Sequence, residues 1–165
     1  MKEQVHVGLV GSGFVSTIHA ESLRRCPYAV LSAVASPRRP RVRVFARRFG
    51  IPHVYTDYRE MLRMPELDMV VIGTPNDLHA PMVLDAAAAR KHVVVEKPLC
   101  LNLQEANRMI EAFRRAGVMM YAEELCFAPK YVRLKQLLDS GALGRPTLIK
   151  QSEKHDSAHA DHFGT

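Results

Sequence analysis

The sequence has no tryptophan and only three cysteines among its 165 residues. The cysteines, Cys26, Cys100 and Cys126, are an odd number without metal-ligand spacing, which predicts free thiols in a reducing compartment and hence a cytoplasmic protein. No apolar run is long enough to span a membrane, so no membrane partner is expected. Residues 1–4 lead directly into a predicted strand, and no signal peptide is expected before the fold.

Aromatic residues make up 7% of the chain, and the excess of basic residues gives a formal net charge of +6. Such a charge favours an anionic ligand, with nucleic acid as one candidate. The basic residues are, however, spread along the chain apart from one arginine cluster, and there is neither a nucleic-acid motif nor an aromatic stacking platform. Nucleic acid is therefore not an expected partner.

Apolar segments of strand type alternate with segments of helical periodicity along the chain. The expected strands are residues 5–10, 30–35, 53–55, 69–72, 92–95 and 118–122. Helices are expected from Phe14 onward and over residues 42–49, 57–62, 78–90 and 102–117. This alternation predicts an α/β fold with a doubly wound parallel sheet of Rossmann type, whose ligand lies beyond the carboxyl ends of the strands.

Details of these helices are also predicted. Asp57 is expected to cap the helix over residues 57–62, and Asn102 with Glu105 has the spacing of a capping box. In the helix over residues 42–49, the residues expected to pack inward are Val42, Val44, Phe45 and Phe49.

A glycine-rich turn follows the first strand. Gly11 can adopt the backbone angles of a sharp turn, and Gly13 has no Cβ, so that a pyrophosphate can approach the chain closely. The helix that begins near Phe14 and Val15 points its first amides at that anion. Ser16 replaces the usual third glycine and is small enough for close packing. The alternative is an ordinary strand-turn-helix unit that binds nothing.

The second strand ends where a Rossmann domain meets the adenosine ribose. Ser36 stands there in place of an acidic residue, and Arg38 and Arg39 follow it. A serine hydroxyl and a guanidinium can bind a 2′-phosphate that an aspartate would repel, so this pattern favours NADP over NAD as the cofactor. The alternative is that the six arginines of this segment form the solvated side of the next helix: Arg38, Arg39, Arg41, Arg43, Arg47 and Arg48.

The loops after the strands ending at Ile72 and Val95 contain Thr74-Pro75-Asn76 with His79, and Glu96-Lys97-Pro98. With these motifs the chain resembles the Gfo/Idh/MocA family of NAD(P)-dependent oxidoreductases over nearly its whole length. The resemblance rests on the following segments in this order: Gly11-x-Gly13, residues 74–76 with His79, residues 96–98, residues 126–129 and residues 141–144.

The resemblance implies hydride transfer between NAD(P) and a sugar, polyol or related carbonyl compound. By the same resemblance, the cofactor lies against Thr74, Pro75, Asn76 and His79, Glu96 helps to position it, and the peptide bond before Pro98 is cis. Lys97 is implied to reach the substrate oxygen, where an ammonium group can polarise a carbonyl or assist proton movement. The alternative for Lys97 is a surface lysine paired with Glu96.

Members of this family continue into a second α/β domain that carries the catalytic histidine and supports oligomers. We expect residues 1–123 to form the dinucleotide-binding domain and residues 124–165 to begin the second one, with a first strand over residues 147–151. A homo-oligomer is one expectation. The expected catalytic histidine would lie beyond Thr165, which leaves two alternatives to an enzyme: a nucleotide-binding regulatory module and a fragment. A methyltransferase also has a glycine-rich turn, but it needs no Lys97.

Several acidic and histidine side chains lie close together near the end of the sequence: His155, Asp156, His159, Asp161 and His162. They could ligate a metal ion, but no element is predicted to hold them in place, so we expect a loop and no metal. Among the other histidines, only His79 is predicted to have a functional role, and no role is predicted for His19.

Overall fold

A computed structural model describes residues 4–152 of the chain. The chain divides into two compact units, one ending at Ala122 and the other beginning at Glu123. Within the described residues, no helix is both long enough and apolar enough to cross a membrane.

The first unit is built on a six-stranded sheet in the order β3-β2-β1-β4-β5-β6. All neighbouring strands are parallel, so their carboxyl ends share one edge of the sheet. The doubly wound sheet is therefore confirmed. Its strands are β1 (Val5–Val10), β2 (Ala29–Ala35), β3 (His53–Tyr55), β4 (Met69–Ile72), β5 (His92–Glu96) and β6 (Met119–Ala122).

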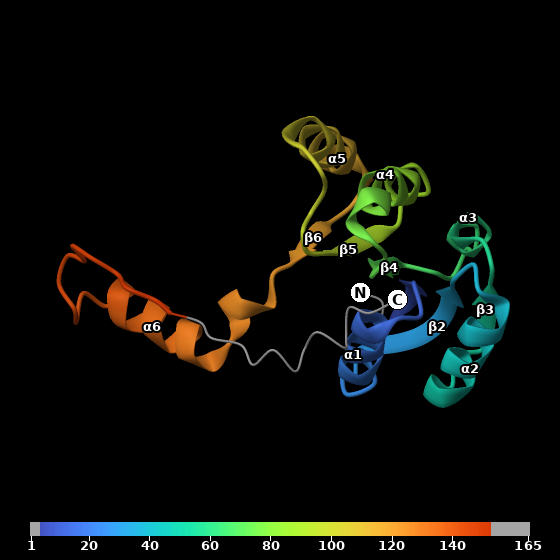
Figure 1. Cartoon of the computed structure of the whole chain (residues 1–165), viewed down its shortest axis with the longest axis horizontal. Helices are drawn as coiled ribbons and strands as arrows, with labels where there is room; N and C mark the ends of the chain where they lie inside the picture. Colours follow the sequence, from blue (N-terminus) through green and yellow to red (C-terminus); the bar gives the residue numbers. More distant parts are fainter. Residues whose placement is uncertain (1–3, 153–165) are drawn as a thin grey trace. The chain divides into compact units, whose positions relative to one another are not determined.

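Helices cover both faces of this sheet. On one face lie α1 (Phe14–Leu23) and α2 (Arg39–Phe49), and on the other lie α4 (His79–Ala88) and α5 (Leu103–Ala116), as Figure 1 shows. The short helices η1 (Asn76–Leu78) and α3 (Tyr58–Leu62) complete the unit. Each face has its own apolar core, because alternate strand residues point to opposite sides. Leu9 and Phe45 belong to the core under α1 and α2, whereas Ile72 and Met109 belong to the other.

The expected helix caps are confirmed. The Asp57 carboxylate accepts a hydrogen bond from the Arg59 amide (2.9 Å), and the Asn102 side chain accepts one from the Glu105 amide (2.9 Å). The Glu105 carboxylate in turn accepts from the amide of Leu101 (3.0 Å), so the two side chains together satisfy two amides at the start of α5.

One inward-facing residue of α2 is predicted wrongly. Val44 is 63% exposed, whereas the buried residues of the helix are Val42, Phe45, Ala46 and Phe49. These four residues follow the spacing of one helical face, and Val44 lies about 200° around the axis from Val42. Ala46 takes the inward position that was expected for Val44.

The second unit contains the short helix η2 (Glu124–Phe127) and α6 (Pro129–Asp139). The strand expected over residues 147–151 is wrong, because these residues have no strand structure. Strand-type residues form a strand only when a neighbouring strand pairs their backbone groups. The His155–His162 cluster lies outside the described residues.

Candidate functional site

The turn after β1 lies at the carboxyl edge of the sheet. Gly11 has a φ of +111°, in the region that side chains disfavour, and its amide donates to the Ala35 carbonyl at the end of β2 (2.8 Å). This hydrogen bond ties the glycine turn to the neighbouring strand end. The sharp turn expected at Gly11 is therefore present.

Gly11 also packs against the loop that follows β4. A Cβ atom on Gly11 would lie 2.7 Å from the Gly73 carbonyl oxygen, which is too close for any side chain. The Gly73 amide donates to the Val10 carbonyl (2.9 Å). The loops after β1 and β4 are thus in direct backbone contact.

Ser16 lies beside this contact. It is 2% exposed, and Cβ atoms built on Gly11 and Gly73 would lie 3.0 and 3.1 Å from its hydroxyl oxygen. Within the described part of the chain, that buried hydroxyl has no hydrogen-bond partner. Ser16 therefore fits where the third glycine is usual, but it leaves one buried polar atom unpaired.

The first turn of α1 is open to an anion. Gly13 occupies the N-cap position and has no side chain to offer the first amides, and no acidic residue lies in the first turn. Among the described residues, a Cβ atom on Gly13 would have one neighbour within 4 Å, the Arg41 guanidinium at 3.9 Å. Phe14 and Val15 begin the helix at this place. The positive end of the helix dipole and a guanidinium therefore face the same space above Gly13.

The end of β2 lies next to the glycine turn. The Ser12 hydroxyl donates to the Ser36 hydroxyl (3.1 Å), and the Arg41 guanidinium donates through Nε to the Ser12 carbonyl (3.2 Å). Ser36 is thus within reach of a ligand held by the turn. The side chain of Arg38 is exposed, and its guanidinium makes no hydrogen bond or ion pair within residues 4–152.

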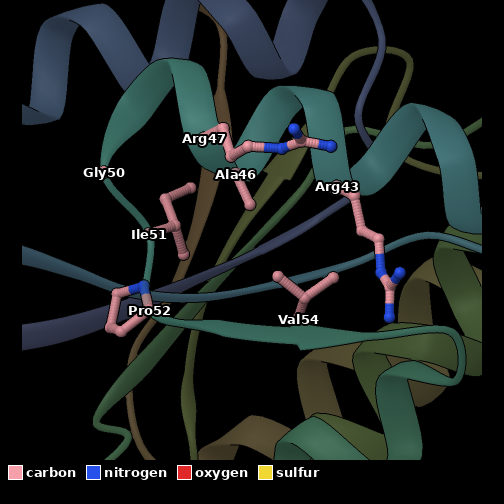
Figure 2. Close-up of a pocket in the computed structure, with 7 residues that line it drawn as sticks. All are labelled: Arg43, Ala46, Arg47, Gly50, Ile51, Pro52 and Val54. Atoms are coloured by element: carbon pink, nitrogen blue, oxygen red, sulfur yellow. The ribbon is translucent and has the colours of Figure 1, made fainter.

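The other arginines lie elsewhere. Arg48 pairs with Glu21 on α1 (3.1 Å). Arg43 and Arg47 line a shallow pocket of about 450 Å³ between α2 and β3, which Figure 2 shows together with Gly50, Ile51, Pro52 and Val54. Arg39 lines a smaller pocket of about 220 Å³ near Tyr55 and Glu60. The arginine cluster of the sequence is therefore divided, and Arg41 is the member bonded to the glycine turn.

The loops after β4 and β5 meet at His79. This side chain is 1% exposed, and its ring nitrogens lie 3.0 Å from the Pro98 carbonyl oxygen (Nδ1) and 2.9 Å from the Thr74 carbonyl oxygen (Nε2). The Thr74 hydroxyl points to the sulfur of Met82 (3.4 Å). Pro75 is exposed and Asn76 is partly buried at the start of η1. The buried ring of His79 thus contacts one backbone carbonyl from each of the two loops.

Glu96 and Lys97 end β5 at the same edge. The Glu96 carboxylate bonds through one oxygen to His19 Nε2 (2.8 Å) and through the other to the Lys97 amide (3.1 Å). The peptide bond between Lys97 and Pro98 is cis, as expected. Lys97 is exposed, and its ammonium takes part in none of the ion pairs found within residues 4–152. The alternative in which Lys97 simply pairs with Glu96 is not what the structure shows.

Two residues of this region were missed by sequence reasoning. His19 lies on α1 and bonds to Glu96, which is 77 positions away in the chain. Arg41 was one of six similar arginines. Neither has a local pattern that singles it out, although a helix beginning at Phe14 puts His19 in its second turn.

Metal binding finds no support in the described part of the chain, where no group of three or more His, Cys, Asp or Glu side chains could hold an ion.

Residues 5–124 match the model of the oxidoreductase family with an NAD-binding Rossmann fold, GFO_IDH_MocA. The chain belongs to this family. It is 33% identical over 147 residues to myo-inositol 2-dehydrogenase of Thermotoga maritima, covering 88% of this chain and 44% of that protein. It is also 33% identical to scyllo-inositol 2-dehydrogenase (NAD(+)) of Bacillus subtilis, covering 99% of this chain and 48% of that protein.

The fold of this chain is also similar to that of a solved structure from this family. Levoglucosan dehydrogenase in complex with NADH superposes with a TM-score of 0.82 at 30% identity, covering 86% of this chain and 41% of that chain. The chain therefore spans less than half the length of these relatives, and the matched part is a nicotinamide-nucleotide-binding Rossmann domain of an oxidoreductase family.

Proposed function

We propose that this chain binds a nicotinamide adenine dinucleotide along the carboxyl edge of its sheet and takes part in hydride exchange with a sugar, a polyol or a related carbonyl compound. The observation that carries the proposal is the junction at Gly11 and Gly73, where the uncapped start of α1 meets the loop that leads to Thr74. Inositols and levoglucosan are named for the relatives, which supports this substrate class.

The residues present fit such a cofactor. The amides at the start of α1 and the Arg41 guanidinium face the open space above Gly13, where a diphosphate would be held. The nicotinamide half would lie at the neighbouring strand ends, which are lined by Thr74, Pro75, Asn76, Glu96, Lys97 and Pro98. When bound, the nicotinamide supplies or accepts the hydride.

Lys97 is proposed as the catalytic residue. Its ammonium is exposed and unpaired within the described residues, so it is available to a substrate oxygen. In reduction it polarises a carbonyl and donates a hydrogen bond to the developing alkoxide, and in oxidation it assists loss of the hydroxyl proton. Glu96 does not neutralise Lys97, because the Glu96 carboxylate is bonded to His19.

We further propose a preference for NADP over NAD. No acidic side chain follows β2, and Ser36 lies beside the glycine turn through its contact with Ser12. Arg38 is exposed two positions after Ser36, and the Arg41 guanidinium is bonded to the glycine turn through the Ser12 carbonyl. A 2′-phosphate at this place would gain a hydroxyl donor and a guanidinium, which together strengthen binding by a factor of about ten or more.

The cofactor proposal is tested by titrating the protein with NADPH and with NADH while following nucleotide fluorescence. We expect tighter binding of NADPH, a loss of that preference in Arg38→Ala or Arg41→Ala, and a reversed preference in Ser36→Asp. Arg47→Ala is the matched control, because Arg47 lines the pocket in Figure 2 and not the glycine turn. Equal affinities for the two nucleotides in the unaltered protein would exclude the preference, and absence of binding would exclude the cofactor site.

The catalytic proposal is tested with Lys97→Met on a panel of inositols and sugars. We expect the turnover rate to fall by about 100-fold or more while nucleotide affinity stays within about threefold, because Lys97 acts on the substrate. Lys150→Met, a change at an exposed lysine of the second unit, serves as the control. If Lys97→Met abolishes nucleotide binding, the assigned role is wrong.

A further inference from the structure

Two histidines contact the three-residue segment Glu96–Pro98, one at each end of it. His19, from α1, bonds to the Glu96 carboxylate (2.8 Å), and His79, from the first turn of α4, bonds to the Pro98 carbonyl (3.0 Å). Lys97 stands between the two contacted residues. The other Glu96 oxygen accepts from the Lys97 amide (3.1 Å), so the residue is also held through its own backbone.

The side chain of His79 is buried between two backbone carbonyl groups. Both ring nitrogens face backbone carbonyl oxygens, which only accept hydrogen bonds, and the side chain is 1% exposed. A neutral imidazole has a single N–H and can donate to only one of them. His79 therefore donates to one carbonyl and contacts the other, and its buried ring lies between the Thr74 loop and Pro98.

The contact of His19 has a different effect. The side chains of His19 and Glu96 are 22% and 13% exposed, so the pair is largely shielded from water. A hydrogen bond to a carboxylate is stronger than one between neutral groups, particularly where water is excluded. The carboxylate is therefore held in the orientation that accepts the Lys97 amide.

We propose that His19 and His79 are positioning residues that together fix Lys97 at the carboxyl edge of the sheet. His79 does so as a buried ring that lies between the carbonyls of Thr74 and Pro98 and donates to one of them. The inference rests on the role proposed for Lys97, and it assigns to His79 an action through the backbone in place of direct contact with the cofactor.

The protonation of the rings is measured on the unaltered full chain by long-range proton–nitrogen NMR correlation at neutral pH. We expect Nε2 of His19 to carry the proton that is donated to Glu96, and one ring nitrogen of His79 to carry the proton that is donated to a carbonyl. The His79 and His19 signals are assigned by their loss in His79→Gln and His19→Gln. A His19 ring without a proton on Nε2 would show that it does not donate to Glu96 and would overturn the proposal.

The positioning of Lys97 is measured by the heteronuclear NOE of its backbone amide. In His19→Leu, which removes the donor to Glu96, we expect the amide of Lys97 to become mobile. In His19→Gln, whose amide nitrogen can still donate, we expect recovery of most of the order. In His79→Leu, which removes the donor of the ring, we expect the amides of Lys97 and Leu99 to become mobile. His53→Asn, at an exposed histidine of β3 without such contacts, is the control.

Turnover provides a second readout. Misplacing Lys97 without removing it should lower kcat by about 100-fold in His19→Leu, with nucleotide affinity within about threefold of the unaltered protein. A Lys97 amide that stays ordered in both His19→Leu and His79→Leu would overturn the positioning role. If the unaltered protein shows no turnover on any polyol, the proposed function fails, whereas the ring protonation and the amide order still decide this inference.

Discussion

The two halves of the carboxyl edge use their polar groups in opposite ways. On the β1 and β2 side, Gly13 offers the first amides of α1 no capping side chain, and the Arg38 side chain is unpaired within the described residues. On the β4 and β5 side, the ring of His79 contacts the carbonyls of Thr74 and Pro98, and the carboxylate of Glu96 is bonded to His19. The first half keeps donors available, and the second half uses its donors to hold a loop in place.

This difference matches what the two ends of a dinucleotide need. A diphosphate is recognised by its charge, and free amides and guanidinium groups supply that recognition directly. A reacting ring needs a neighbouring group at a defined position, and position is set by bonds within the protein. The edge is therefore divided into a part that binds and a part that orients.

The largest expected effect comes from Gly11→Ala, which would disrupt the junction of the two halves. The added Cβ would lie 2.7 Å from the Gly73 carbonyl oxygen at a backbone φ of +111°. We expect a loss of about 2–4 kcal/mol in the free energy of unfolding, measured by urea denaturation, together with loss of nucleotide binding. Gly50→Ala is the matched control, because Gly50 has a φ of +68° and no atom within 4 Å of an added Cβ. It should cost about 1 kcal/mol, and an equal loss in both variants would contradict the steric explanation.

A change of salt should separate the two halves. Binding that depends on exposed guanidinium groups weakens as salt screens their charge, and we expect NADPH affinity to fall by about tenfold between about 0.05 and 0.5 M NaCl. The order of the Lys97 amide should not change, since the contact between His19 and Glu96 that holds it is largely shielded. Arg41→Ala should reduce the salt dependence of binding, and an unchanged dependence would show that Arg41 does not face the nucleotide.

Raising the pH should weaken the contact between α3 and α4, which is made by Tyr58 and Asp85. Tyr58 donates to Asp85 (2.6 Å), and burial together with that hydrogen bond raises the pKa of Tyr58 above its ordinary value. A raised pKa means that the neutral phenol stabilises the fold fully below the unfolded-state value of about 10, and that this stability is lost as the pH rises through the folded-state value. Urea unfolding between about pH 8 and pH 11 should show a steeper loss in the unaltered protein than in Tyr58→Phe. Parallel curves for the two proteins would contradict the assignment.

The smallest expected effect is that of Ser16→Ala. The buried Ser16 hydroxyl has no partner within the described residues, so its removal abolishes an unpaired polar group without breaking a hydrogen bond. We expect a gain of about 0.5–1 kcal/mol in the free energy of unfolding, measured in urea. A loss of similar size would show that the hydroxyl has a partner after all.

Local features of the fold could be predicted from the sequence because their causes are local. Asp57 and Asn102 cap helices through residues two and three positions away, and Gly11 turns the chain where the strand ends. Val44 was assigned wrongly because it was chosen for its apolarity and not for its angle on the helix. The segment over residues 147–151 has strand-type residues, but its composition says nothing of a partner strand.

The contacts of the candidate site could be predicted only in part. The motifs at residues 74–76 and 96–98 stand at strand ends, so their gathering at one edge follows from the parallel sheet. The link between His19 and Glu96 joins residues 77 positions apart, and the selection of Arg41 among its neighbours depends on how α2 lies against the glycine turn. Such pairs are determined by tertiary packing, which no single segment of the sequence contains.

The backbone contact between Gly11 and Gly73 has a mechanical consequence. A displacement of either peptide by a few tenths of an ångström must be followed by the other, because close-packed atoms transmit strain. Binding of phosphate groups above the glycine turn should therefore restrict the motion of the loop that leads through Thr74 to His79. Nucleotide fragments that carry only the adenosine and phosphates should thus make this loop more rigid, although they have no nicotinamide ring.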